Sequence, residues 1–197
     1  MLAIGGLAAL AAVAIVIALV VGGGDDGADA RTALETAGCT LNASPALRGV
    51  HSISTPAGSS DQWKTDPPTS GPHFEVPAVW GSYDDPVNQA QLVHNLEHGG
   101  IAVLHGSDVS AEMVSQLKGF VQEHPRGTVL APYASLRSQI SLGAWVVPDP
   151  EDPTQLGTAY LAKCPGFDQT AFDAFFDAYQ FQGPERFPPD TLLPGRT

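Results

Sequence analysis

The sequence predicts a small mixed α+β domain with a mainly antiparallel sheet and helices on one face of it. The part of the chain after an N-terminal apolar run has roughly 165 residues, which suits one domain and is too short for two. Its periodic segments follow the order helix, strand, helix, strand, strand, helix, without an internal repeat. This order is typical of helices packed on a mostly antiparallel sheet.

The chain begins with an unbroken, uncharged apolar run over residues 2–21. At roughly 1.5 Å per residue this run can cross a hydrocarbon core of about 30 Å, so we expect residues 1–21 to form a single transmembrane anchor. A secretory signal has a basic start, and no Lys or Arg precedes this run. The alternative is a cleaved signal peptide, with Ala28-Asp29-Ala30 as the cleavage site.

Residues 22–30 are rich in Gly and Asp, which predicts a flexible linker. The first charges after the apolar run belong to Asp25, Asp26 and Asp29, whereas cytoplasmic loops next to a membrane span carry an excess of Lys and Arg. We therefore expect the domain over residues 31–197 to lie on the extracytoplasmic side of the cell membrane.

The domain opens with a brief predicted helix over residues 31–38. Residues 40–81 contain many Pro, Ser, Gly and Asn residues, which predicts a long loop with short extended pieces. Trp63, Phe74 and Trp80 favour an ordered loop, because disordered segments seldom carry many large apolar side chains. A long ordered loop inside a compact domain usually serves a function.

Regular structure follows this loop. Pro86 suits the first turn of a helix over residues 85–98, and Gly99 suits its left-handed end. Aromatic residues recur at helical spacing in the last predicted helix, which indicates core packing. The other predicted elements are strands over residues 101–104, 128–131 and 140–147 and helices over residues 110–123 and 168–181.

The charge of the chain excludes one class of partner. There are 9 Lys and Arg residues against 21 Asp and Glu residues, a formal net charge of -12. The basic residues are scattered singly along the sequence. Phosphate contacts need clustered basic side chains, so we expect no nucleic acid partner.

The chain has two cysteines, Cys39 and Cys164. In an oxidising compartment an isolated pair of this kind most often forms a disulfide. Closing so long a loop contributes about 4–5 kcal/mol in the chain-entropy account. The alternative makes the cysteines soft metal ligands, but neither has a histidine or a second cysteine nearby at ligand spacing.

The most informative segment of the sequence is His94-Asn95-Leu96-Glu97-His98-Gly99-Gly100. Positions four apart lie on one face of a helix, roughly 5–6 Å apart at Cβ, so His94 and His98 can bind one metal ion. Glu97 can act as a ligand, as a base, or as an acceptor that orients a ligand. The alternative is a pair of ordinary helix-face histidines bonded to backbone carbonyls.

Two further histidines are candidate ligands. His73 ends the restricted loop Pro67-Pro68-Thr69-Ser70-Gly71-Pro72, which can hold a ligand at low entropic cost. His51 precedes an extended segment and would complete a site of four histidines: His51, His73, His94 and His98. His124 before Pro125 fits a structural role at a helix end.

The pairing of the segment 67–73 with the segment 92–100 resembles a family of bacterial and archaeal envelope proteins catalogued as a domain of unknown function. The resemblance also includes the segments 49–51, 143–145, 164–167 and 183–185 and so spans most of the exported domain. It implies a membrane-anchored or exported protein, and its histidines map to His51, His73, His94 and His98, with Glu97 beside them. His105 departs from the family pattern, in which an aromatic residue is expected.

Three functions fit the sequence. The first is a non-catalytic envelope protein that captures or delivers a copper or zinc ion, because imidazoles without thiolates suit these metals. The second is a zinc hydrolase of the H-x-x-E-H type, in which Glu97 would activate a metal-bound water. Its third zinc ligand would be a carboxylate, and the candidates are Glu112, Glu123 and Glu185. The third is a metal-free polar network in a module that docks on an envelope complex, with Trp63, Trp80 and Trp145 as packing or interface residues.

Overall fold

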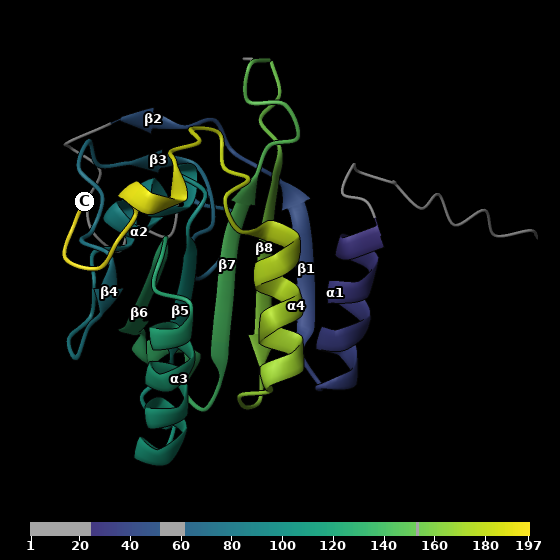
Figure 1. Cartoon of the computed structure of the whole chain (residues 1–197), viewed down its shortest axis with the longest axis vertical. Coiled ribbons are helices and arrows are strands. Elements are labelled where there is room, and N and C mark those ends of the chain that lie inside the picture. Colours follow the sequence, from purple (N-terminus) through teal and green to yellow (C-terminus); the bar gives the residue numbers. More distant parts are fainter. Residues whose placement is uncertain (1–24, 52–61, 153) are drawn as a thin grey trace, which may run out of the picture.

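A six-stranded sheet forms the centre of the molecule (Figure 1). The computed structural model describes residues 25–51, 62–152 and 154–197, so the predicted anchor over residues 1–21 lies outside the described residues. The strand order is β1 (Thr40–Pro45), β8 (Thr158–Cys164), β7 (Ile140–Val146), β5 (Ile101–His105), β6 (Thr128–Pro132) and β4 (Gly81–Ser82). The first four strands in this order pair antiparallel with their neighbours, whereas β5 with β6 and β6 with β4 pair parallel. The predicted α+β class and mostly antiparallel sheet are confirmed.

Helices cover both faces of this sheet. One hydrophobic cluster contains Ile101 and Val103 of β5 together with residues of α1 (Asp25–Thr36), α3 (Ala111–Glu123) and α4 (Gln169–Tyr179). The other contains Ala102 and Leu104 of β5 together with α2 (Gln89–Glu97). The expectation of helices on one face was therefore wrong. The physical reason is in β5, whose continuous apolar run is the pattern of a strand buried on both sides.

The helices differ from their predicted bounds at several ends. α1 begins at Asp25, inside the predicted linker, and ends at Thr36, before Gly38 with its positive φ. α2 begins at Gln89, four residues beyond the predicted start. The side chain of Asn88 accepts a hydrogen bond from the Ala90 amide and so caps the helix. α3 and α4 start beside caps of the same kind, Ser110 and Asp168. None of the described helices combines the length and the apolar character that crossing a bilayer requires.

Two long strands were missed by the sequence prediction. β1 lies in the predicted loop over residues 40–81, and no element was predicted for β8. The two pair antiparallel in a register that sets Thr40 opposite Lys163. The residues just before and just after that pair, Cys39 and Cys164, are joined by a disulfide, as predicted. The edge strand β1 is mostly exposed, and although polar and apolar residues alternate along it, Asn42, Ala43 and Pro45 are poor strand formers that read as loop residues.

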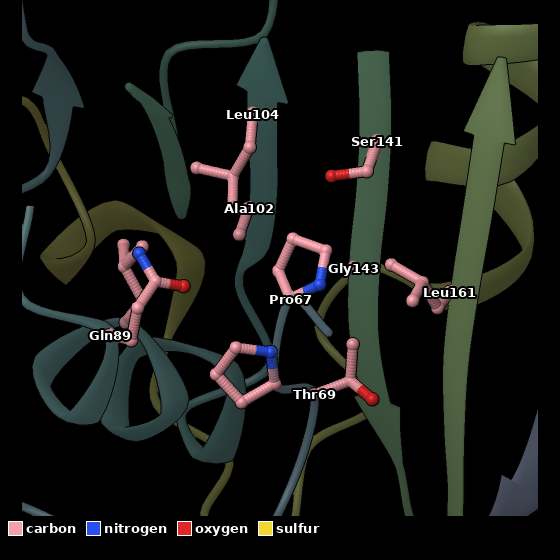
Figure 2. Close-up of a pocket in the computed structure, with 10 residues that line it drawn as sticks. Pro67, Thr69, Gln89, Ala102, Leu104, Ser141, Gly143 and Leu161 are labelled. Atoms are coloured by element: carbon pink, nitrogen blue, oxygen red, sulfur yellow. The ribbon is translucent and has the colours of Figure 1, made fainter. Parts of the chain in front are cut away.

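The rigid proline loop is fixed by packing against the sheet (Figure 2). Pro67, Pro68 and Thr69 lie against side chains of β5, β7 and β8, and the seam between loop and sheet leaves no volume for a water molecule. Gly143 of β7 allows this approach, because a Cβ there would stand 3.2 Å from Thr69 Cγ2. The loop therefore reaches the next segment, β3 (Pro72–His73), in a fixed position. The remaining short elements are β2 (Val50–His51), η2 (Ala134–Leu136) and η3 (Pro189–Thr191).

Candidate metal centre

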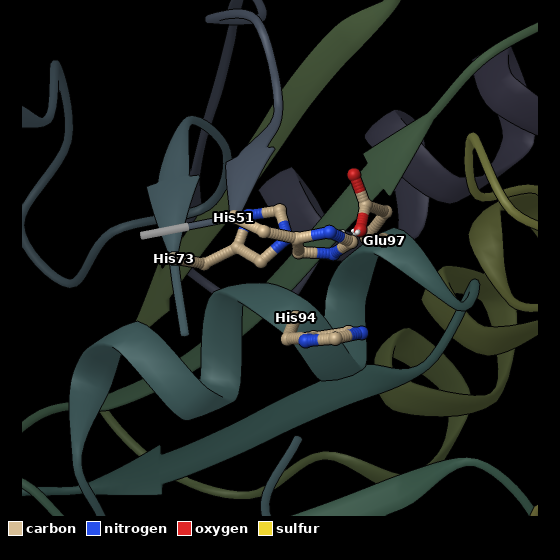
Figure 3. Close-up of side chains that lie close together, drawn as sticks. All are labelled: His51, His73, His94 and Glu97. Carbon is tan, nitrogen blue, oxygen red and sulfur yellow. Dashed lines mark ion pairs between the residues drawn. The ribbon is translucent and has the colours of Figure 1, made fainter. Parts of the chain in front are cut away.

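Three histidines and one carboxylate converge where a small second sheet meets the end of α2 (Figure 3). β2 and β3 form a two-stranded parallel pair whose register sets His51 directly beside His73. His94 and Glu97 are three residues apart on α2 and therefore project from the same side of that helix. The long loop and the helix predicted over residues 85–98 thus meet at one point, as expected from the sequence.

The four side chains are close enough to share one ion. One ligand atom from each of His51, His73, His94 and Glu97 lies within 4.8 Å of the corresponding atom of every other. Glu97 Oε2 stands 2.9 Å from His73 Nε2 and 3.4 Å from His51 Nε2. Three members of the group are buried, while the His51 side chain is 45% exposed. This group can hold a metal ion.

Backbone carbonyls fix the ring orientation of the two buried histidines. His73 Nδ1 donates to the Gly71 carbonyl oxygen at 2.8 Å, and His94 Nδ1 donates to the Phe74 carbonyl oxygen at 2.6 Å. A carbonyl oxygen can only accept, so each neutral ring must carry its proton on Nδ1. Nε2 of each ring then carries a lone pair. This is the tautomer that a metal-ligating histidine adopts, with its other nitrogen bonded to an orienting acceptor.

Two polar atoms at the heart of the group lack hydrogen-bond partners. His73 Nε2 and Glu97 Oε2 are both buried and 2.9 Å apart; the contact is an ion pair when His73 is protonated, but it is not aligned as a hydrogen bond and neither atom has a hydrogen-bond partner elsewhere. Buried polar atoms are nearly always paired, because leaving one unsatisfied costs roughly 1–3 kcal/mol. The unpaired nitrogen and oxygen of these two fixed side chains are a donor set for a cation.

The electrostatics of the group are dominated by burial and by the Glu97 carboxylate. Burial disfavours the charged form of His73, yet Glu97 outweighs it and raises the pKa of His73 above 6.5. Burial likewise disfavours ionised Glu97, but His73 and the other histidines outweigh it and lower the pKa of Glu97 below 4.5. Burial lowers the pKa of His94. A metal ion would replace the proton that the carboxylate favours on His73.

His98 lies outside the group of four. Its Nε2 contacts His94 Nε2 at 3.0 Å, on the side of α2 that meets the C-terminal segment. Glu185 Oε2 is 3.7 Å from the same nitrogen, and the Phe187 ring lies against the His98 ring with centroids 4.4 Å apart. Burial, together with His94, lowers the pKa of His98 to about 4. The predicted set thus divides, with Glu97 inside the group and His98 beside it.

His105 and His124 do not belong to the group of four. His105 ends β5, and its ring contacts the carbonyl oxygen of Gly106. His124 caps the C-terminal end of α3 and bonds to the carbonyl oxygen of Phe120, as its predicted structural role requires. The three carboxylates that were candidates for the third zinc ligand of a hydrolase also lie outside the group of four. Glu112 and Glu123 belong to α3, and Glu185 contacts His98.

A buried amide that the sequence analysis did not single out holds the loop on α2. Asn95 Oδ1 accepts from the Ala78 amide, and Asn95 Nδ2 donates to the Ala78 carbonyl oxygen. Both bonds fix the segment after β3 against the helix that carries His94 and Glu97. The signal available in the sequence was Asn95 itself, because Asn is a poor helix former and is uncommon inside a helix unless its side chain has a specific partner.

Gly49 makes room for the Glu97 carboxylate. A Cβ on Gly49 would lie 2.4 Å from Glu97 Oε1, so Gly49→Ala must displace that carboxylate from the group. We expect the substitution to weaken metal binding about 10-fold or more, as observed when residues that orient ligands are changed. Competition against a chelator measures this. Gly119→Ala is the matched control, because nothing lies within 4 Å of a Cβ there, and it should leave the affinity unchanged.

Comparison with known proteins identifies the family. No curated protein and no solved structure matches this chain. A family model described as "Protein of unknown function (DUF3105)" matches residues 55–191, which include His73, His94, Glu97 and His98. His51 and Gly49 precede the matched region. Because the match covers well over half of the sequence, the chain belongs to this family of unknown function.

Proposed function

We propose that this protein binds one transition metal ion, copper or zinc, through His51, His73, His94 and Glu97, and that it captures or delivers that ion outside the cytoplasmic membrane. The observation that carries the proposal is the buried pair of atoms His73 Nε2 and Glu97 Oε2, which face each other without a hydrogen bond. An ion between them would satisfy both atoms.

The donor set supports this choice of metal. Imidazole nitrogens suit copper and zinc, whereas calcium and magnesium prefer oxygen ligands. One carboxylate among three imidazoles also partly neutralises a divalent ion in a buried setting. The exposed side chain of His51 makes one edge of the group accessible to solvent, which suits an ion that must enter and leave.

The geometry gives less support to a hydrolase. In an H-x-x-E-H enzyme both histidines bind zinc and the glutamate stays free to activate water. Here Glu97 contacts His73 and His51, while His98 Nε2 faces His94 instead of joining the group. A metal-free network remains the main competitor, because the Glu97 carboxylate also forms an ion pair with a protonated His73.

We also propose that the domain works in an oxidising compartment. The disulfide between Cys39 and Cys164 supports an extracytoplasmic location, since cytosolic thiols are kept reduced. The apolar run over residues 2–21 supports attachment to the membrane, but it lies outside the described residues.

Metal content provides the direct test of binding. The full chain, purified without an affinity tag from metal-replete cells, should contain about one copper or zinc ion per molecule, the stoichiometry of a single four-ligand site. His94→Ala removes a ligand and should abolish retention. His124→Ala removes a histidine from the end of α3 and serves as the control, which should retain the ion. A wild-type protein without metal under these conditions would favour the metal-free network.

A further inference from the structure

The contact between His94 and His98 joins the proposed metal site to the C-terminal segment. The two Nε2 atoms lie 3.0 Å apart and are aligned as a hydrogen bond. One ring belongs to the group of four, and the other stands between that group and Glu185. The direction of this hydrogen bond decides what His98 can do.

The backbone determines that direction. Because His94 Nδ1 donates to the Phe74 carbonyl oxygen, Nε2 of the neutral ring has a lone pair and can only accept. His98 Nε2 must therefore carry the proton and donate it to His94. His98 presents an N–H to the site, whereas a metal ligand has to present a lone pair.

We propose that His98 is a positioning residue that competes with the metal ion for the Nε2 lone pair of His94, so that metal binding requires this hydrogen bond to break. The inference rests on the proposed function and adds a device that sets the affinity and exchange rate of the site. His98 acts through His94 and does not coordinate the ion.

The released N–H has an acceptor within reach. Glu185 Oε2 is 3.7 Å from His98 Nε2, and its side chain is 49% exposed, so a small movement brings it into hydrogen-bonding distance. Backbone bonds hold this carboxylate near α2, since the Glu185 amide donates to the Glu97 carbonyl oxygen at 2.9 Å. The buried neutral acceptor His94 is thus replaced by a carboxylate that is half exposed and already hydrated, so the new bond offsets only part of the lost one.

His98→Phe tests whether His98 competes with the metal ion, because competition predicts that the substitution raises the zinc affinity. Phenylalanine keeps the aromatic contact with Phe187 but lacks the N–H, so the lone pair of His94 becomes free. We expect zinc affinity, measured by chelator competition on the full chain, to rise about threefold to tenfold, the worth of one neutral hydrogen bond. A ligand role for His98 would instead weaken binding, and a packing role would leave it unchanged. Either of these results overturns the inference.

A second variant tests whether Glu185 accepts the N–H of His98 when the metal ion is bound. Glu185→Gln should weaken zinc binding about twofold to threefold in the wild-type background, because an amide is a poorer acceptor than a carboxylate. The same substitution made together with His98→Phe should have no effect, since no N–H remains to be accepted. Equal weakening in both backgrounds would contradict the exchange and would identify Glu185 as acting on the ion directly.

Ring nitrogen NMR of the unsubstituted, metal-free chain gives a test that needs no variant. The account predicts His94 protonated on Nδ1, His98 protonated on Nε2, and a scalar coupling across the hydrogen bond between the two Nε2 atoms. Zinc sulfate should abolish that coupling. A His98 proton on Nδ1, or a coupling that persists with zinc bound, contradicts the inference. Absence of zinc binding by the wild type would defeat the proposed function itself, whereas unchanged affinity in His98→Phe defeats only the competition.

Discussion

Glu97→Gln should weaken zinc binding by about 100-fold or more, beyond the effect of residues that merely orient ligands, while the metal-free fold keeps its stability. The carboxylate is the one anionic donor in the group, and the amide has the same shape without the charge. Burial lowers the pKa of His73 and Glu97 is what raises it, so in the variant His73 becomes neutral, no buried charge is left unpaired, and the amide N–H can donate to His73 Nε2.

The two effects separate a metal site from a structural network. Chelator competition measures the affinity, and urea denaturation of the metal-free protein measures the free energy of unfolding. Glu123→Gln on the exposed end of α3 is the matched control and should change neither. If Glu97→Gln destabilised the metal-free fold and left zinc retention unchanged, the network account would replace the metal centre.

Removal of the disulfide should lower the free energy of unfolding by about 5 kcal/mol, the chain-entropy value for so long a loop. The bridged cysteines are separated by 125 residues in sequence, and both are buried in the cluster that contains α1 and α4. The measurement compares urea denaturation of the wild type with and without reductant. In the double variant Cys39→Ala with Cys164→Ala, reductant should have no effect.

The same variants separate stability from binding. The bridge lies in the cluster on one face of the sheet, whereas α2 with its ligands packs on the other face. The double alanine variant should therefore keep its zinc affinity at temperatures where it remains folded. A stability change below about 1 kcal/mol would show that the bridge contributes far less than the chain-entropy value.

Local sequence signals predicted the parts of the site that depend on local geometry. The restricted proline loop brings His73 to the end of α2 beside His94, as predicted. The i, i+4 spacing of His94 and His98 predicted that these two rings meet, but the ring of His98 bonds to His94 instead of joining the group, and Glu97 joins it. The direction of His98 could not be predicted in this way. His98 is the C-cap of α2, and its ring lies against Phe187, a residue of the distant C-terminal segment.

The fold was predictable to a similar extent. The helices over residues 111–123 and 169–179 carry apolar residues at helical spacing and were predicted within a few residues of their observed ends. The pairing of β1 with β8 could not be predicted from strand patterns, because β1 contains residues that are poor strand formers and its partner lies more than a hundred residues away in sequence. The two cysteines were the one sequence signal that these segments meet.

Anomalous diffraction from crystals of the zinc-loaded protein, recorded on both sides of the zinc absorption edge, tests the central claim most directly. The account predicts one peak about 2.0–2.2 Å from His73 Nε2, His94 Nε2 and a Glu97 oxygen, the distances of zinc ligands, with His98 turned toward Glu185. The absence of a peak at the four side chains, or a peak bound by His98 and Glu185 in their place, would contradict it.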